Sequence, residues 1–129
     1  MRFTRDATAG INLIHAYGGG ELRINDTVYR GAVIVSAATL LNEPQMLTFE
    51  ELLSDRLLGA DASRITALDP EVLLLGTGAR QIFAPPEFGA RFLRKGIGFE
   101  VMDTGAACRT YNVLAGEQRR VVAVLLAGA

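Results

Sequence analysis

The chain has very few of the side chains that bind metals or form disulfides. Its 129 residues contain one cysteine, one histidine and no tryptophan. Cys108 alone cannot form an intrachain disulfide, and with one histidine it cannot supply a metal cluster. We therefore expect no metal and no cofactor. The low cysteine content fits a reducing compartment, and we expect a cytoplasmic protein.

An excess of positive charge and a long apolar segment are lacking as well. The formal net charge is -1, and the twelve arginines and one lysine are scattered, which argues against a nucleic-acid partner. We attribute the arginine bias to the base composition of a bacterial genome. The most apolar run, Val121 to Ala127, is far shorter than the roughly 20 residues that span a bilayer. No apolar stretch follows Arg2 and Arg5, so no secretory signal is indicated.

The hydrophobic residues that are present make up 50% of the chain, enough for one core. We expect residues 1–129 to form a single α/β domain. Its reference point is Val72 to Leu75, a run without polar alternation that indicates a strand covered on both faces. The run leads into Gly76-Thr77-Gly78, where the glycines permit a tight turn.

The first third of the sequence has the alternating pattern of a β meander. Residues 11–17, 21–24 and 27–29 predict short antiparallel strands separated by Gly18-Gly19-Gly20 and Asn25-Asp26. Gly31 then leads into Ala32 to Val35, a continuous apolar run that predicts a buried strand. Residues 40–46 contain Pro44 and are expected to cross the surface irregularly.

A capping box marks the start of the first predicted helix. Thr48 and Glu51 have the spacing in which each side chain bonds the other residue's backbone amide. The expected apolar face contains Phe49, Leu52, Leu53 and Leu57, and Gly59 is the expected C-terminal stop. Residues 60–70 are polar and rich in turn-forming residues.

The second half predicts a strand, a helix and a parallel strand. Pro85-Pro86-Glu87 indicates a helix start, and Phe88, Phe92 and Leu93 are its expected apolar face. Gly96 ends this helix before the strand Phe99 to Met102. A strand, a helix and a second strand within about thirty residues indicate a right-handed βαβ unit.

A third helix and a last strand complete the predicted domain. Asp103-Thr104 is expected to cap the helix, and Gly116 to end it. The predicted buried face contains Ala107, Cys108, Tyr111, Leu114 and Ala115, and residues 120–126 predict a buried strand.

Three segments carry a resemblance to a known family. The segments are Leu73 to Gly78, Gly96 to Gly98 with Val101 to Thr104, and Ala107 to Leu114 with Glu117 to Ala123. They resemble the domain-of-unknown-function family that includes the third assembly factor of mitochondrial respiratory complex I and the adipogenesis-associated protein. The resemblance implies a three-layer fold with a central mixed five-stranded sheet, one strand being antiparallel to the rest, and a small N-terminal β layer. It implies no catalytic residues, and a role in complex assembly.

The candidate catalytic groups have ordinary structural explanations. Gly76-Thr77-Gly78 begins like a dinucleotide-binding motif, but Gln81 replaces the third glycine. Cys108 falls on an apolar helix face, where a thiol usually packs as a small hydrophobe. His15 falls among apolar strand residues, and we expect a hydrogen-bonded structural role. We assign no catalytic residue, and an enzymatic activity stays open, with a non-enzymatic role preferred.

The remaining polar residues predict one possible binding cleft. Arg80, Thr104 and Arg109 would converge with the glycine turn at the carboxyl ends of the parallel strands. A helix N-terminus and guanidinium groups favour a carboxylate or phosphate. The predicted anion-binding residues are Gly76, Thr77, Gly78, Arg80, Thr104 and Arg109. The alternative is that either arginine pairs with a neighbouring surface carboxylate.

Two functions follow as hypotheses. The first is a non-enzymatic assembly or interaction factor, with an unidentified protein partner, in the biogenesis of a membrane or respiratory complex. The second is a small-anion-binding protein or an enzyme that uses the predicted cleft. The first rests on the resemblance alone, because a fold does not fix a function.

Overall fold

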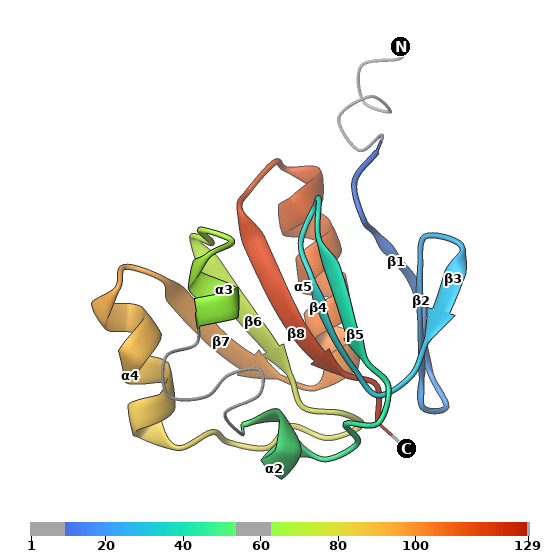
Figure 1. The fold of residues 1–129 in the computed structure, drawn as a ribbon, viewed down its shortest axis with the longest axis horizontal. Coiled ribbons are helices and arrows are strands. Elements are labelled where there is room, and N and C mark those ends of the chain that lie inside the picture. The colour runs from blue at the N-terminus through green and yellow to red at the C-terminus, as the bar shows by residue number, and fades with distance from the viewer. Residues whose placement is uncertain (1–9, 54–62, 129) are drawn as a thin grey trace.

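The computed structural model describes residues 10–53 and 63–128 of the chain (Figure 1). Within these residues two β-sheets are combined with four helices. In chain order the elements are β1 (Ile14–Gly18), β2 (Glu21–Ile24), β3 (Thr27–Tyr29), β4 (Ala32–Val35), β5 (Leu40–Glu43), α2 (Phe49–Leu52), α3 (Ser63–Thr66), β6 (Val72–Gly76), α4 (Pro86–Arg94), β7 (Gly98–Met102), α5 (Thr104–Gly116) and β8 (Val121–Leu126).

The larger sheet has the order β5-β4-β8-β6-β7. Strands β6, β7 and β8 are parallel, whereas β4 is antiparallel to both β5 and β8. One strand therefore runs against the other four, and the expected mixed five-stranded sheet is confirmed. The predicted parallel pairing of β6 with β7 around α4 is also confirmed.

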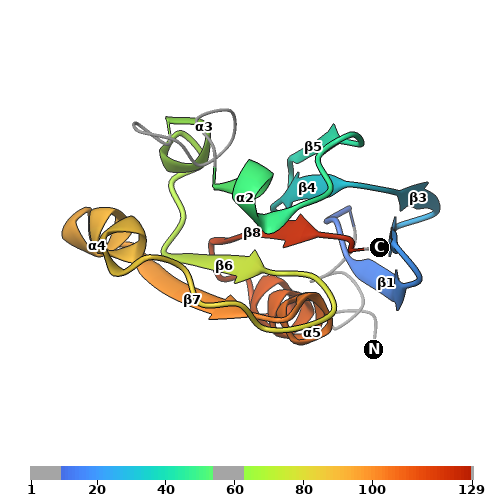
Figure 2. The ribbon, with the colours of Figure 1, turned by 90° about the horizontal axis from the view of Figure 1, so that it is seen from below.

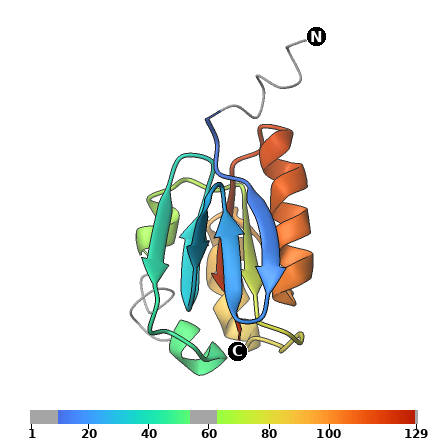
Figure 3. The same ribbon diagram turned by 90° about the vertical axis from the view of Figure 1, so that its right-hand side faces the viewer.

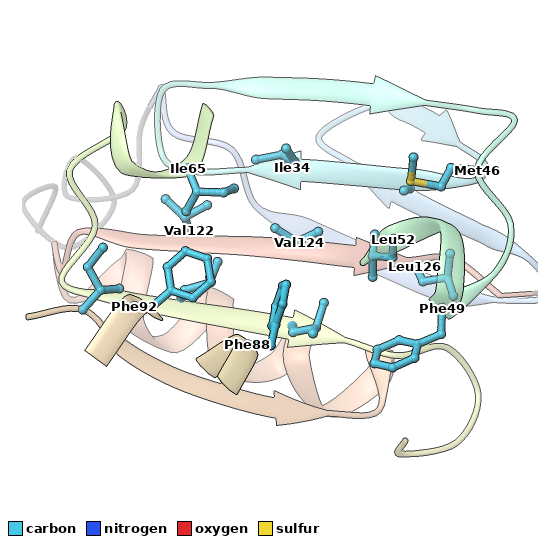
Figure 4. Packing of buried hydrophobic residues seen from close by; sticks show 14 residues of the cluster. Ile34, Met46, Phe49, Leu52, Ile65, Phe88, Phe92, Val122, Val124 and Leu126 are labelled. Carbon is cyan, nitrogen blue, oxygen red and sulfur yellow. The ribbon is translucent and has the colours of Figure 1, made fainter. Parts of the chain in front are cut away.

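Two apolar clusters cover the two faces of this sheet and make the fold three-layered. One contains side chains from α2, α3 and α4 that meet side chains from β4 and β8, as Figure 4 shows. The other joins the sheet to α5 and to the antiparallel β1-β2-β3 sheet. Figures 2 and 3 show α5 and the small sheet on the side away from α2 and α3.

The small sheet is attached to α5 by the side chains of Asn112 and Tyr111. Asn112 accepts from the Ile14 amide at 2.9 Å, and its Nδ2 donates to the Ile14 carbonyl at 2.7 Å. One residue earlier in α5, the Tyr111 hydroxyl donates to the Asn12 carbonyl at 2.8 Å. These bonds satisfy backbone groups of the edge strand β1 and of the segment just before it, and fix both against the helix.

Two short elements lie where the sequence predicts irregular chain. Residues 40–43 form the edge strand β5, which pairs along its whole length with β4. The Asn42 side chain supports this pairing through bonds to the carbonyls of Arg30 and Ala32. The turn-rich stretch 60–70 contains the one-turn helix α3, which buries Ile65 completely. Tertiary pairing and burial, not local propensity, produce both elements.

The predicted starts of the helices are confirmed, and the predicted apolar face of α4 is corrected. Thr48 and Glu51 form the complete capping box of α2, while Leu57 and Gly59 lie outside the described residues. Leu93, expected on the apolar face of α4, is 61% exposed. Gly89 is buried there instead, and a Cβ on Gly89 would lie 2.7 Å from the Phe99 ring. No helix in the described ranges is long and apolar enough to cross a bilayer.

Candidate functional site

Thr104 joins three segments at the carboxyl ends of β6 and β8. Its Oγ1 accepts from the Gly78 amide at 2.8 Å and donates to the Leu126 carbonyl at 2.6 Å. Its own amide donates to the Gly78 carbonyl at 2.9 Å. Asp103 is the N-cap of α5, so Thr104 is the first helical residue and lies over the strand ends. The hydroxyl proton of Thr104 is therefore used in a hydrogen bond that stabilises the fold.

Thr77 closes the glycine turn in the same manner. Its Oγ1 donates to the Arg80 carbonyl at 2.6 Å and accepts from the Ile82 amide at 3.2 Å. The side chain of Thr77 is buried, and it holds the backbone of Arg80 while the Arg80 side chain remains exposed. These bonds make Thr77 a structural residue of the turn.

The glycines of this turn serve different purposes. Gly78 has a φ of +102°, a conformation that L side chains rarely adopt, although a Cβ there would find space. A Cβ on Gly76 would lie 2.9 Å from the Thr104 Oγ1 and 3.0 Å from a Leu125 methyl group. Gly78 is thus required by its backbone, and Gly76 by the close approach of α5 and β8.

A pocket of about 230 Å³ lies beside the start of α5. Main chain from four segments forms most of its wall, because half of the lining residues are glycines. The lining residues are Tyr17, Gly18, Gly19, Gly20, Gly78, Ala79, Asp103, Thr104, Gly105, Arg109, Ala127 and Gly128.

The structure brings together three of the six predicted anion-binding residues in this pocket. Gly78, Thr104 and Arg109 line it. Gly76 and Thr77 are buried in the adjoining turn, and Arg80 is an exposed residue outside the pocket lining. The predicted pair of guanidinium groups is therefore not found in this pocket, which contains Arg109 but not Arg80.

Arg109 contacts Tyr17, a residue that the sequence reasoning missed. Its Nη1 donates to the Tyr17 hydroxyl, and its guanidinium carbon lies 5.9 Å from the centre of the Tyr17 ring. Gly105 permits this arrangement, since a Cβ there would lie 2.8 Å from the ring. The run Gly18-Gly19-Gly20 was the available signal that the β1-β2 turn could approach another segment closely.

Most of the helix N-terminus is already hydrogen-bonded. Among the first four amides of α5, Thr104 bonds to Gly78, Ala106 to the Asp103 carboxylate, and Ala107 to the Asp103 carbonyl. Only Gly105 remains without a partner in the described part of the chain. An anion in the pocket would meet this amide and Arg109, but also the negative charge of Asp103.

The cysteine and the histidine lie in opposite environments. Cys108 is 1% exposed and packs in the core cluster beneath α5, as the sequence predicts, and this burial raises the pKa of its thiol to about 12. The His15 side chain is exposed in β1 and makes no hydrogen bond to the described residues, so the expected hydrogen-bonded structural role for His15 is wrong. Within the described ranges no three His, Cys, Asp or Glu side chains are placed to hold a metal ion.

The fold and sequence are similar to those of several known proteins. A crystal structure from Bordetella parapertussis is 36% identical with a TM-score of 0.77, covering 92% of this chain and 98% of that one. A Danio rerio protein, NADH dehydrogenase [ubiquinone] 1 alpha subcomplex assembly factor 3, is 32% identical over 95% of this chain and 67% of its own. The 13 kDa major membrane protein of Francisella tularensis is 29% identical over 85% and 86%, respectively.

A family model matches residues 14–126, from the first strand of the small sheet to the end of β8. The matched range contains the glycine turn, the capped start of α5 and the pocket between them, together with the motifs that carried the resemblance. The chain therefore belongs to the family of proteins of unknown function designated DUF498/DUF598.

Proposed function

We propose that the protein is a non-enzymatic assembly factor that acts by binding another protein during the biogenesis of a membrane or respiratory complex. One observation carries this proposal: the Danio rerio relative, which aligns with nearly the whole chain, is named as an assembly factor of NADH dehydrogenase. We place this action in the cytoplasm of a bacterium, on the aqueous side of the membrane.

The bonding of the polar residues at the strand ends supports a binding role over catalysis. Thr77 and Thr104 use their hydroxyls to hold the turn and α5, and Asp103 caps the helix. Burial keeps the Cys108 thiol protonated. A nucleophile requires an activating base nearby. The Thr77 and Thr104 hydroxyls, the Asp103 carboxylate and the Cys108 thiol are instead used in structural hydrogen bonds or in core packing.

The test is genetic and biochemical. The gene is deleted in its native cell, and NADH dehydrogenase is followed on native gels by activity staining. We expect less of the assembled complex and an accumulation of partial assemblies, both reversed by the wild-type gene. Cross-linking of the tagged chain should then retain a subunit of those partial assemblies. An undiminished complex in the deletion strain would contradict the proposal.

The pocket beside α5 supports a second candidate, a small-anion-binding protein or an enzyme. The observation in its favour is that Gly78, Thr104 and Arg109 line one pocket. Because one guanidinium and the Asp103 carboxylate both line this pocket, the affinity for an anion should be weak. Thermal stabilisation by a metabolite would favour this candidate, and retention of a specific protein would favour the first.

A further inference from the structure

We propose that the edge of the molecule formed by residues 80–95, namely the last part of the β6-α4 loop, α4 and its C-cap, binds the surface of an anionic lipid bilayer. This inference is independent of the proposed assembly role, because it rests on the exposure, placement and charge of this segment. We call residues 80–95 the basic edge.

The basic edge exposes three large apolar side chains. Phe83 is 84% exposed, Leu93 is 61% exposed and Ile82 is 43% exposed. Single exposed hydrophobic residues are normal on protein surfaces. Here three occur within one short segment, although α4 already buries Phe88 and Phe92 in the core. The exposed apolar side chains are therefore additional to those that packing requires.

Two contacts place the loop and α4, the two elements that carry these side chains, along the same edge of the larger sheet. Gln81 Nε2 donates to the Val101 carbonyl at 3.3 Å, which fixes the loop beside the terminal strand β7. Gly89 of α4 packs against Phe99 of β7, and Leu93 follows Gly89 by one helical turn. Ile82, which follows Gln81, and Leu93 thus belong to elements that both border β7.

Figures 1 and 2 show where this edge lies in the molecule. The loop after β6 runs back beside β7 to α4, and α4 lies at the opposite end from β1, β2 and β3. The α4 part of the basic edge, with Leu93, Arg94 and Lys95, is consequently far from the small sheet, whose exposed residues can serve as controls.

Charge identifies the surface that this edge fits. Residues 80–95 contain four basic side chains and one carboxylate, a net charge of +3 in a chain whose net charge is -1. Arg80, Arg94 and Lys95 are exposed, and the Arg91 guanidinium lies 5.0 Å from the centre of the Phe88 ring. Basic groups beside exposed Phe, Ile and Leu are the combination that binds anionic membrane interfaces.

The arrangement favours a bilayer over an acidic protein. A protein hot spot needs an anchor that fills a complementary pocket at the centre of a packed interface. Side chains spread along an edge suit a lipid interface, which admits protruding apolar groups without a shaped partner. Each exposed basic residue then gains from the negative headgroups, on the order of fivefold in affinity per residue at low salt.

Co-sedimentation of the full chain with lipid vesicles tests this proposal. The vesicles are made of phosphatidylcholine alone or of phosphatidylcholine with an equal part of phosphatidylglycerol. We expect binding to the mixed vesicles only, and a decrease when salt is raised. Phe83→Ser should lower this binding by about threefold or more, and the double variant Arg94→Gln/Lys95→Gln by on the order of 25-fold at low salt, at about fivefold per residue.

Val28→Ser and Arg23→Gln are the matched controls, because both residues are exposed in the small sheet at the opposite end. They should bind like the wild type, and circular dichroism should show that all variants are folded. Absence of binding to the mixed vesicles would overturn the proposal, as would equal losses in the control variants. Binding to soluble polyglutamate without binding to vesicles would also overturn it and assign the basic edge to an acidic protein.

Discussion

The Thr104 hydroxyl bridges the Gly78 amide and the Leu126 carbonyl, and so ties the start of α5 to the ends of β6 and β8. Thr104 is 4% exposed, so neither backbone group can turn to water if the hydroxyl is removed. Thr104→Val, which keeps the shape, should lower the free energy of unfolding by about 2–4 kcal/mol, because two buried groups lose their partner.

Thr104→Ser is the matched variant, since it retains the hydroxyl and loses one methyl group. It should cost about 1 kcal/mol. Urea unfolding followed by circular dichroism measures both values. Equal losses for the two variants would show that the methyl group, not the bridge, stabilises this junction.

Gly78 should resist substitution for a backbone reason. Its φ of +102° disfavours any side chain, and Gly78→Val should cost on the order of 1–3 kcal/mol of stability. Gly98 is the control, because it has no positive φ and a Cβ there would make ordinary contacts of 3.5 Å. Gly98→Ala should leave the midpoint of thermal unfolding almost unchanged. A Gly78→Val variant of wild-type stability would mean that the turn can change its conformation freely.

The buried thiol predicts a dependence of stability on alkaline pH. Burial raises the pKa of Cys108 from its usual value near 9 to about 12. The unfolded chain therefore loses this proton first, so the stabilisation that comes from the neutral thiol is complete below pH 9 and is lost between pH 9 and 12. Comparison of denaturant unfolding for wild type and Cys108→Ala across this range isolates the effect.

Cys108→Ala should be modestly less stable than the wild type near neutral pH, and the difference should shrink as the pH rises. The assembly function should persist in this variant. A loss of function without a loss of stability would restore a chemical role for the thiol.

The candidate anion site can be tested by NMR with inorganic phosphate. Amide shifts at Gly78, Gly105 and Ala106 should move at phosphate concentrations in the range of roughly millimolar to tens of millimolar. Arg109→Gln should abolish the shifts, whereas Arg80→Gln should not, because Arg80 lies outside the pocket lining. Unchanged spectra would dismiss the site and leave the assembly role as the only candidate.

Patterns tied to local chemistry predicted much of the fold. The capping box at Thr48, the Asp103 cap and the apolar run at Val72 each specify an element through contacts within a few residues. The edge strand β5 could not be found this way, because its pairing with β4 supplies what its own sequence lacks. Leu93 was misplaced because Gly89, which has no apolar side chain, occupies the position against Phe99.

The sequence predicted where the candidate site lies in the fold, but not which side chains contact one another there. Gly78 and Thr104 are neighbours because parallel strands end at one edge of the sheet, which topology alone indicates. The contact of Arg109 with Tyr17 depends on how the small sheet packs against α5, and no local pattern encodes that distance of 92 residues along the chain.

Native gels of cells that lack this protein test the assembly role most directly. We expect less assembled NADH dehydrogenase and an accumulation of partial assemblies, both reversed by the wild-type gene and by the Cys108→Ala gene. A normal amount of the assembled complex in the deletion strain, at wild-type levels of its subunits, would contradict it.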